Sequence, residues 1–238
     1  MSHLDLNDHH AYQQWVDFKS ESYAQRSADN FPLLIDIEPD GVISAPALKR
    51  LSQHIKQFNF ALYRLNAEQV DTIDHKNAIK NIAVQAGLKA LDGNLCAMED
   101  RMTKLTVVEE GKGSHYIPYS NKAISWHNDG YYNPFDQRVL AMILHCEHPA
   151  ASGGENDLLD QDMVYIHLRN ENPDFISALS APGVMCIPEN VQQGQLIRAQ
   201  TCSAVFMQEA VDNDTGDQSH VLAMRYSQRK RHIIWSQD

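Results

Sequence analysis

The chain has 238 residues, of which 43% are hydrophobic, and its formal net charge at pH 7 is −11. A chain of this length can bury a sizeable core as one large domain or two small ones, and one domain is the simpler interpretation. The negative charge argues against a general nucleic-acid binder, and no stretch approaches the roughly 18 consecutive apolar residues of a membrane span.

The first 31 residues are polar and rich in histidine, and we expect them to form a helical or loose lead-in to a domain over residues 32–238. They contain neither the basic n-region nor the apolar h-region of a secretory signal, so we expect a cytoplasmic protein. The four cysteines are far apart and form no Cys-x-x-Cys pair, which argues against a zinc or redox motif. The sequence therefore predicts free, mostly buried thiols.

The first part of the domain predicts strands alternating with helices. A short apolar run at 32–38 ends in a Pro-Asp-Gly turn and is typical of a strand. Ser44 then stands as the N-cap of an amphipathic helix, because apolar residues follow it at helical spacing. Residues 59–65 predict a second strand, and residues 67–86 predict a longer helix with one apolar stripe.

From residue 103 onward the pattern changes to short strands and turns. The nearly continuous apolar run at 138–146 predicts a strand buried on both faces. Residues 162–179 predict a helix interrupted at Pro173, and residues 220–228 predict another strand. The order indicates a small α/β start followed by a mainly β body.

The stretch SWHNDGYYN at residues 125–133 places a histidine and a carboxylate one residue apart, as His127 and Asp129. In an extended segment, residues i and i+2 project to the same face, so both side chains can reach one metal ion. These two groups and one further histidine would make the facial triad of non-haem Fe(II) oxygenases, which leaves coordination positions open. Zinc is an alternative occupant.

Two plainer explanations compete with the metal hypothesis. The chain contains 12 His, and the same His-x-Asp spacing recurs at residues 3–5, so chance alone supplies such triplets. The Asp-Gly pair at 129–130 is also a common surface-turn sequence. What favours a metal is the setting, because the neighbouring aromatic residues could exclude water and orient the ligands.

Two blocks of the sequence resemble the TauD/TfdA-like family, the taurine-catabolism type of Fe(II)/2-oxoglutarate dioxygenases. One is Trp-His-x-Asp-Gly at 126–130, and the other is Gly-Gly-Glu-Asn at 153–156, before an acidic helix start. Similarity extends through ISAPALKRLSQHIKQFNFALYRL and VLAMRYSQRKRHIIW and covers most of residues 32–235.

The resemblance implies an α+β fold with a double-stranded β-helix, or jelly roll, and flanking helices. It also implies Fe(II) and the cosubstrate 2-oxoglutarate, with His127 and Asp129 as the first two iron ligands. Asn156 falls where relatives commonly use a threonine to hydrogen-bond 2-oxoglutarate, and an amide can donate that bond. Three further residues are candidates for the pocket wall, with ordinary packing as the alternative: Tyr119, Tyr131 and Asn133.

The chain departs from the family pattern near its end. The family's second histidine ligand and its 2-oxoglutarate arginine lie on late strands, and neither downstream histidine, His220 or His232, has the expected context. We therefore expect domain 32–238 to be truncated at the C-terminus, with an unpaired sheet edge that favours association into homo-oligomers. Three arginines could clamp a carboxylate, although they precede the family's position: Arg225, Arg229 and Arg231.

The resemblance implies an oxidoreductase that couples decarboxylation of 2-oxoglutarate to succinate with hydroxylation of a small organic substrate. One alternative is a catalytically incomplete remnant of the fold that binds a metal or a partner. A zinc hydrolase is a weaker alternative, because no His-Glu-x-x-His motif accompanies His127. The expected partner is a small molecule, with neither nucleic acid nor a membrane, and the fold does not specify which molecule.

Overall fold

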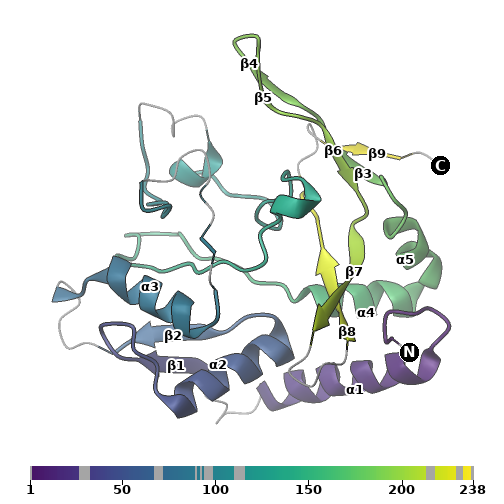
Figure 1. Ribbon diagram of the computed structural model, residues 1–238, viewed down its shortest axis with the longest axis horizontal. Coiled ribbons are helices and arrows are strands. Elements are labelled where there is room, and N and C mark those ends of the chain that lie inside the picture. Colours follow the sequence, from purple (N-terminus) through teal and green to yellow (C-terminus); the bar gives the residue numbers. More distant parts are fainter. Residues whose placement is uncertain are drawn as a thin grey trace.

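A computed structural model describes residues 2–26, 33–66, 72–88, 90–91, 93, 99–109, 116–212, 218–228 and 233–236. Helices and strands alternate in the first part, and strands dominate the later part (Figure 1). The helices are α1 His9–Arg26, α2 Ala45–Phe58, α3 His75–Gln85, α4 Gln161–Glu171 and α5 Pro173–Leu179, with 3-10 turns η2 Ile117–Tyr119 and η3 Phe135–Gln137. The strands are β1 Leu34–Ile37, β2 Leu62–Leu65, β3 Met185–Ile187, β4 Asn190–Gln192, β5 Gln195–Arg198, β6 Thr201–Ser203, β7 Phe206–Asp212, β8 Gln218–Met224 and β9 Ile234–Trp235.

The predicted strand–helix–strand start of the domain is confirmed. β1 and β2 pair in parallel, and α2 connects them, as parallel neighbours require. α2 begins where predicted, since the Ser44 side chain accepts a hydrogen bond from the amide of Ala47 at 3.4 Å. Ile35 and Ile37 are buried against α2 and α3 and form the centre of the first hydrophobic core.

Helix α3 begins later than predicted. Its N-cap is Asp74, whose carboxylate accepts a hydrogen bond from the amide of Asn77 at 3.1 Å. An aspartate that bonds the backbone in this way marks a helix start, so the apolar stripe before it does not extend the helix. Residues 67–71 of the predicted helix lie outside the described residues.

The second hydrophobic core lies between α1, α4, α5 and the strands β3, β7 and β8. The predicted break at Pro173 is confirmed, because α4 ends and α5 starts there, with the Asn172 side chain capping α5. The predicted lead-in also belongs to this body, since the Tyr12 hydroxyl on α1 donates to the side chain of Asn170 at 2.8 Å. Figure 1 shows α1 running beneath the β7–β8 hairpin.

A buried ion cluster joins α1, α2 and α4, and we call it the Lys19 cluster. The Lys19 ammonium lies 2.5 Å from a carboxylate oxygen of Asp160 and 3.1 Å from one of Asp162, and it donates to the carbonyl of Gln57 at 2.8 Å. Asn59 donates a further hydrogen bond to Asp160 at 2.6 Å. The lysine side chain is completely buried, so this polar cluster replaces part of the apolar interface between the helices.

The described strands lie in four small sheets, of which three have two strands and one, β6-β3-β9, has three. The β4–β5 hairpin projects from the body at the top of Figure 1. Its two turn residues, Gln193 and Gly194, both have positive φ, as a two-residue hairpin turn requires. The mixed helical and sheet composition is confirmed, and the jelly roll stays a prediction.

The predicted buried strand at 138–146 is wrong. These residues belong to no named strand in the described part of the chain, and Leu140 is 78% exposed and Met142 57% exposed. Leu105 and Val107, in the predicted strand near residue 103, are exposed as well. A continuous apolar run indicates an affinity for a buried environment, but it carries no information about whether a pairing strand is present.

The prediction of free, mostly buried thiols is wrong for two of the cysteines. Cys186 and Cys202 lie directly opposite each other on β3 and β6 and form a disulfide, with a Cα–Cα distance of 4.0 Å. This pairing depends on strand register, which the sequence spacing does not show. Cys146 is free but exposed, and Cys96 lies outside the described residues.

None of the helices in the described part of the chain combines the length and the apolar character needed to cross a membrane.

Candidate metal-binding site

The segment around His127 is held extended by a short antiparallel pairing with residues 226–228. The amide of Asn128 donates to the carbonyl of Tyr226 at 2.9 Å, and the amide of Gln228 donates to the carbonyl of Trp126 at 2.9 Å. His127 and Ser227 therefore lie opposite each other as an isolated β-bridge. This pairing fixes the backbone direction on the N-terminal side of Asp129.

A tight turn follows immediately at Asp129–Gly130, as the surface-turn interpretation predicts, while the metal interpretation stays a prediction. Gly130 has a φ of +67°, and a Cβ atom placed on it would lie 2.6 Å from Cγ2 of Val139. Both facts require a glycine. The amide of Asn133 closes the turn by donating to the carbonyl of Gly130 at 2.8 Å.

The imidazole of His127 is oriented by its own backbone. Its Nδ1 atom lies 2.7 Å from the carbonyl oxygen of Ser125, so Nδ1 carries the hydrogen and donates it. Nε2 is then the basic nitrogen, and it lies 3.4 Å from Oδ1 of Asp129. The two side chains are 31% and 43% exposed, which leaves the pair accessible from solvent.

The donor atoms of the His127–Asp129 pair fit a divalent cation. Two ligand atoms that each lie about 2.1 Å from one ion, at a right angle to each other, are about 3.0 Å apart. This separation is close to the 3.4 Å between Nε2 of His127 and Oδ1 of Asp129. Metal-bound histidines also commonly donate their other ring nitrogen's hydrogen to a carbonyl, as His127 does to Ser125. The same pair forms an ion pair when the imidazole is protonated.

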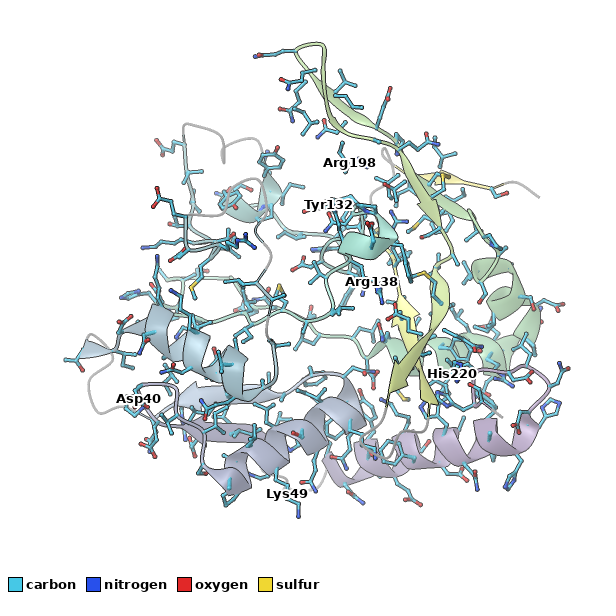
Figure 2. All side chains as sticks on the ribbon, in the orientation of Figure 1. Asp40, Lys49, Tyr132, Arg138, Arg198 and His220 are labelled. Atoms are coloured by element: carbon cyan, nitrogen blue, oxygen red, sulfur yellow. A yellow bond between two sulfur atoms is a disulfide. The ribbon has the colours of Figure 1, made fainter. Side chains whose placement is uncertain are left out.

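A third ligand does not lie beside the pair in the part of the chain that is described. There, no three His, Cys, Asp or Glu side chains form a metal-sized group. His220 is on β8, seven residues before Ser227, and this extended chain corresponds to about 23 Å. Figure 2 agrees, since His220 lies far from Tyr132, which comes just after the Asp129–Gly130 turn. His232 lies outside the described residues.

The candidate 2-oxoglutarate residue, Asn156, lies in an exposed extended segment after a glycine pair. Gly153 and Gly154 both have positive φ, a backbone conformation that glycine adopts without strain. The Asn156 amide donates to the carbonyl of Gly154 at 3.3 Å. Among the described residues it makes no hydrogen bond to His127 or Asp129, so the structure does not join it to the pair.

Of the predicted wall residues, Tyr131 lies beside the pair. Its ring is buried in the second core, and its centroid is 6.4 Å from that of the His127 imidazole. The Asn133 side chain instead donates to the carbonyl of Gln137 at 2.9 Å, which is ordinary turn packing. Tyr119 is buried at the end of η2.

Arg225, one of the candidate carboxylate clamps, is engaged within the protein. Its Nε donates to the carbonyl of Tyr131, and its Nη1 donates to the hydroxyl of Ser203 at 2.5 Å. Burial, and then the charge of Arg198, lower the pKa of Arg225 from its usual value. Figure 2 shows Arg198 above Tyr132, whose ring centroid is 6.0 Å from the Arg198 guanidinium carbon. Arg229 and Arg231 lie outside the described residues.

One polar cluster has no signal in the sequence, because its members come from three distant segments. His145 Nδ1 lies 3.0 Å from the Tyr63 hydroxyl, and His145 Nε2 lies 2.9 Å from His75 Nδ1. Burial, and then the neighbouring His75, lower the pKa of His145, and burial raises the pKa of Tyr63 to about 12. The cluster attaches the segment 138–146 to β2 and α3.

Comparison with known protein families gives one family whose model covers more than half of the chain. The model described as "Taurine catabolism dioxygenase TauD, TfdA family" matches residues 80–233, a range that includes the His127–Asp129 pair, Asn156 and Arg225.

A curated relative, a uridine-5'-phosphate dioxygenase from Streptomyces sp, is 27% identical to this chain over 126 residues. The match covers 52% of this chain and 46% of the relative, so the chain spans about half the length of that protein. No solved structure matches.

Proposed function

Because the chain belongs to the taurine catabolism dioxygenase TauD, TfdA family, we propose that it is an Fe(II)/2-oxoglutarate-dependent dioxygenase. It hydroxylates a small organic substrate and releases succinate and CO2. The observation that carries this proposal is the His127–Asp129 pair, whose Nε2 and Oδ1 atoms lie 3.4 Å apart inside the matched region. The relative's name, which is that of a dioxygenase, supports the same reaction class.

In this proposal His127 and Asp129 hold the Fe(II). The bound metal and 2-oxoglutarate supply the oxidising chemistry, and the chain supplies ligands, orientation and exclusion of water. The hydrogen bond from His127 Nδ1 to the Ser125 carbonyl keeps Nε2 directed at the metal. The buried ring of Tyr131 covers one side of the imidazole and limits access of water there.

Asn156 is proposed to donate a hydrogen bond to 2-oxoglutarate. Its amide now donates to Gly154, and this long local bond can be exchanged for one to a bound carboxylate. The family membership also supports a jelly roll in the matched region and a small-molecule partner. The domain bounds 32–238 and a cytoplasmic location stay predictions from the sequence. Association into homo-oligomers remains part of the proposal, as the sequence suggested.

The test is anaerobic addition of Fe(II) and 2-oxoglutarate to the 238-residue chain, followed as the metal-to-ligand charge-transfer absorption. We expect a band with wild-type protein that His127→Ala abolishes, because the substitution removes one of the two ligands. His167→Ala is the matched control. That histidine is exposed on α4 and pairs only loosely, at 4.0 Å, with Glu171, so its removal leaves the band unchanged.

The alternatives give different results in the same assay. Correctly folded wild-type protein without a band, as judged by circular dichroism, would favour the catalytically incomplete remnant. Zinc bound by freshly purified protein, and released by His127→Ala, would instead favour a zinc site. Succinate formed from 2-oxoglutarate only in the presence of a candidate substrate would identify that substrate.

A further inference from the structure

The chain that follows β8 contacts the backbone on both sides of the Asp129–Gly130 turn. On one side of Asp129, the amide of Asn128 donates a hydrogen bond to the carbonyl of Tyr226 at 2.9 Å. On the other side, the Arg225 side chain donates through Nε to the carbonyl of Tyr131. The only residue between Asp129 and Tyr131 is Gly130, which is held at a φ of +67° in a turn closed by the amide of Asn133. Because the turn is this short, contacts on both sides of Asp129 limit the directions open to its carboxylate.

Arg225 is itself anchored to the second core. Its amide donates to the carbonyl of Val205 at 2.8 Å, and Val205 is buried. Its Nη1 donates to Ser203, the last residue of β6. One planar guanidinium thus connects three segments: the end of β8, the end of β6 and the turn after Asp129. A lysine carries its donors on a single nitrogen, so it cannot reproduce the fixed directions of the guanidinium Nε and Nη1 donors.

The burial of Arg225 is energetically unfavourable for stability alone. The side chain is buried, no carboxylate pairs with it among the described residues, and its Nη2 atom is buried without an acceptor there. A buried charge without a counter-ion requires compensation from its hydrogen bonds. In the Lys19 cluster, by contrast, two carboxylates surround one ammonium. The hydrogen bonds from Arg225 to Tyr131 and Ser203 are therefore the contacts that compensate for its burial.

We propose that Arg225 is a positioning residue for the metal-binding pair. By holding the Tyr131 carbonyl, it keeps the Asp129 carboxylate facing Nε2 of His127. In this role Arg225 acts through its hydrogen bond to the turn and not as a metal ligand. This inference rests on the proposed function, since it assigns a role to a residue of the same site.

The experiment compares Arg225→Lys and Arg225→Met with Arg169→Lys. Arg169 is the matched control, because it is also buried and donates to backbone carbonyls, those of His3, Asp5 and Leu6, in the N-terminal segment. Affinity is measured by anaerobic titration with Co(II) alone, and amide hydrogen exchange is measured without metal. We expect Arg225→Lys to weaken the affinity about 10–100-fold, as loss of an outer contact to a metal ligand does. Arg225→Met should weaken it further, and Arg169→Lys should leave it unchanged.

Hydrogen exchange separates this inference from the proposed function. We expect the amides of Tyr131 and Asn133 to exchange faster in Arg225→Lys than in wild-type protein or Arg169→Lys, whether or not metal binds. Ser203→Ala, a milder change, should shift both readouts in the same direction. Wild-type protein that binds no Co(II) would contradict the proposed function while leaving the exchange test intact. Unchanged exchange at the turn, or equal effects of the Arg225 and Arg169 variants, would overturn the role of Arg225.

Discussion

Two of the places where acidic and basic side chains meet in this molecule have opposite surroundings. In the Lys19 cluster, the lysine and Asp160 are almost completely buried, and hydrogen bonds from several segments occupy their donors and acceptors. In the His127–Asp129 pair, both side chains are about a third exposed or more, and the two facing atoms are 3.4 Å apart.

The difference indicates what each group can do. Charges that are fully enclosed by the protein's own partners can only support the fold, because a ligand has no access to them. A partly exposed pair contributes little to stability but keeps atoms available for an ion. The type of residue is therefore less informative than the arrangement of its surroundings.

Breaking the Lys19 cluster should have the largest effect on stability. Lys19→Met leaves the Asp160 carboxylate buried without its cation, so we expect the free energy of unfolding to fall by about 3–5 kcal/mol. Urea denaturation measures this change. The control is Lys49→Met, since Lys49 is exposed on α2 and its removal should change stability by less than about 0.5 kcal/mol. Similar losses in the two variants would contradict the comparison.

A substitution in the turn should have a smaller effect on stability and a larger one on metal binding. Gly130→Ala introduces a Cβ at positive φ and 2.6 Å from Val139, so we expect a loss of about 1–3 kcal/mol and a weaker charge-transfer band. Gly87→Ala is the control, because Gly87 has a similar φ but nothing within 4 Å of an added Cβ. Equal losses of stability would show that the contact with Val139 is unimportant.

The smallest effect on stability is expected at the partly buried cluster of His145, Tyr63 and His75. Burial, and then His75, lower the pKa of His145 below the usual 6.5, so the unfolded chain binds more protons near and below that pH. The contribution of His145 to stability is therefore complete above about pH 6.5 and declines as the pH falls. Urea denaturation of wild-type protein and His145→Phe should show a stability difference that narrows from pH 7.5 to pH 5. Parallel curves would contradict this expectation.

Features that depend on neighbouring residues in the sequence could be predicted. The cap at Ser44 and the break at Pro173 both follow from local backbone preferences, and the structure has each of them. The exposed run at 138–146 was mispredicted, because its burial depends on pairing with a distant strand. Helix α1 was expected to be a lead-in, since a polar helix gives no sign that its Lys19 is buried.

The candidate site likewise combines features that depend on neighbouring residues with features that depend on distant segments. The spacing of His127 and Asp129 is local, so the sequence could indicate that the two side chains face each other, and their facing atoms are 3.4 Å apart. The contacts that hold them in place could not be predicted. Arg225 was considered as a carboxylate clamp, but its bonds to Tyr131 and Ser203 depend on the meeting of three segments.

The bridge between His127 and Ser227 also affects how the protein is made, because its two residues are 100 positions apart in the chain. At a synthesis rate of roughly 5–20 residues per second, the histidine waits about 5–20 s for its partner to be translated. Closing so long a loop carries a larger entropic penalty than closing the shorter loop of the β1–α2–β2 unit. The turn at Asp129–Gly130 is therefore among the last parts of the nascent chain to take its final form.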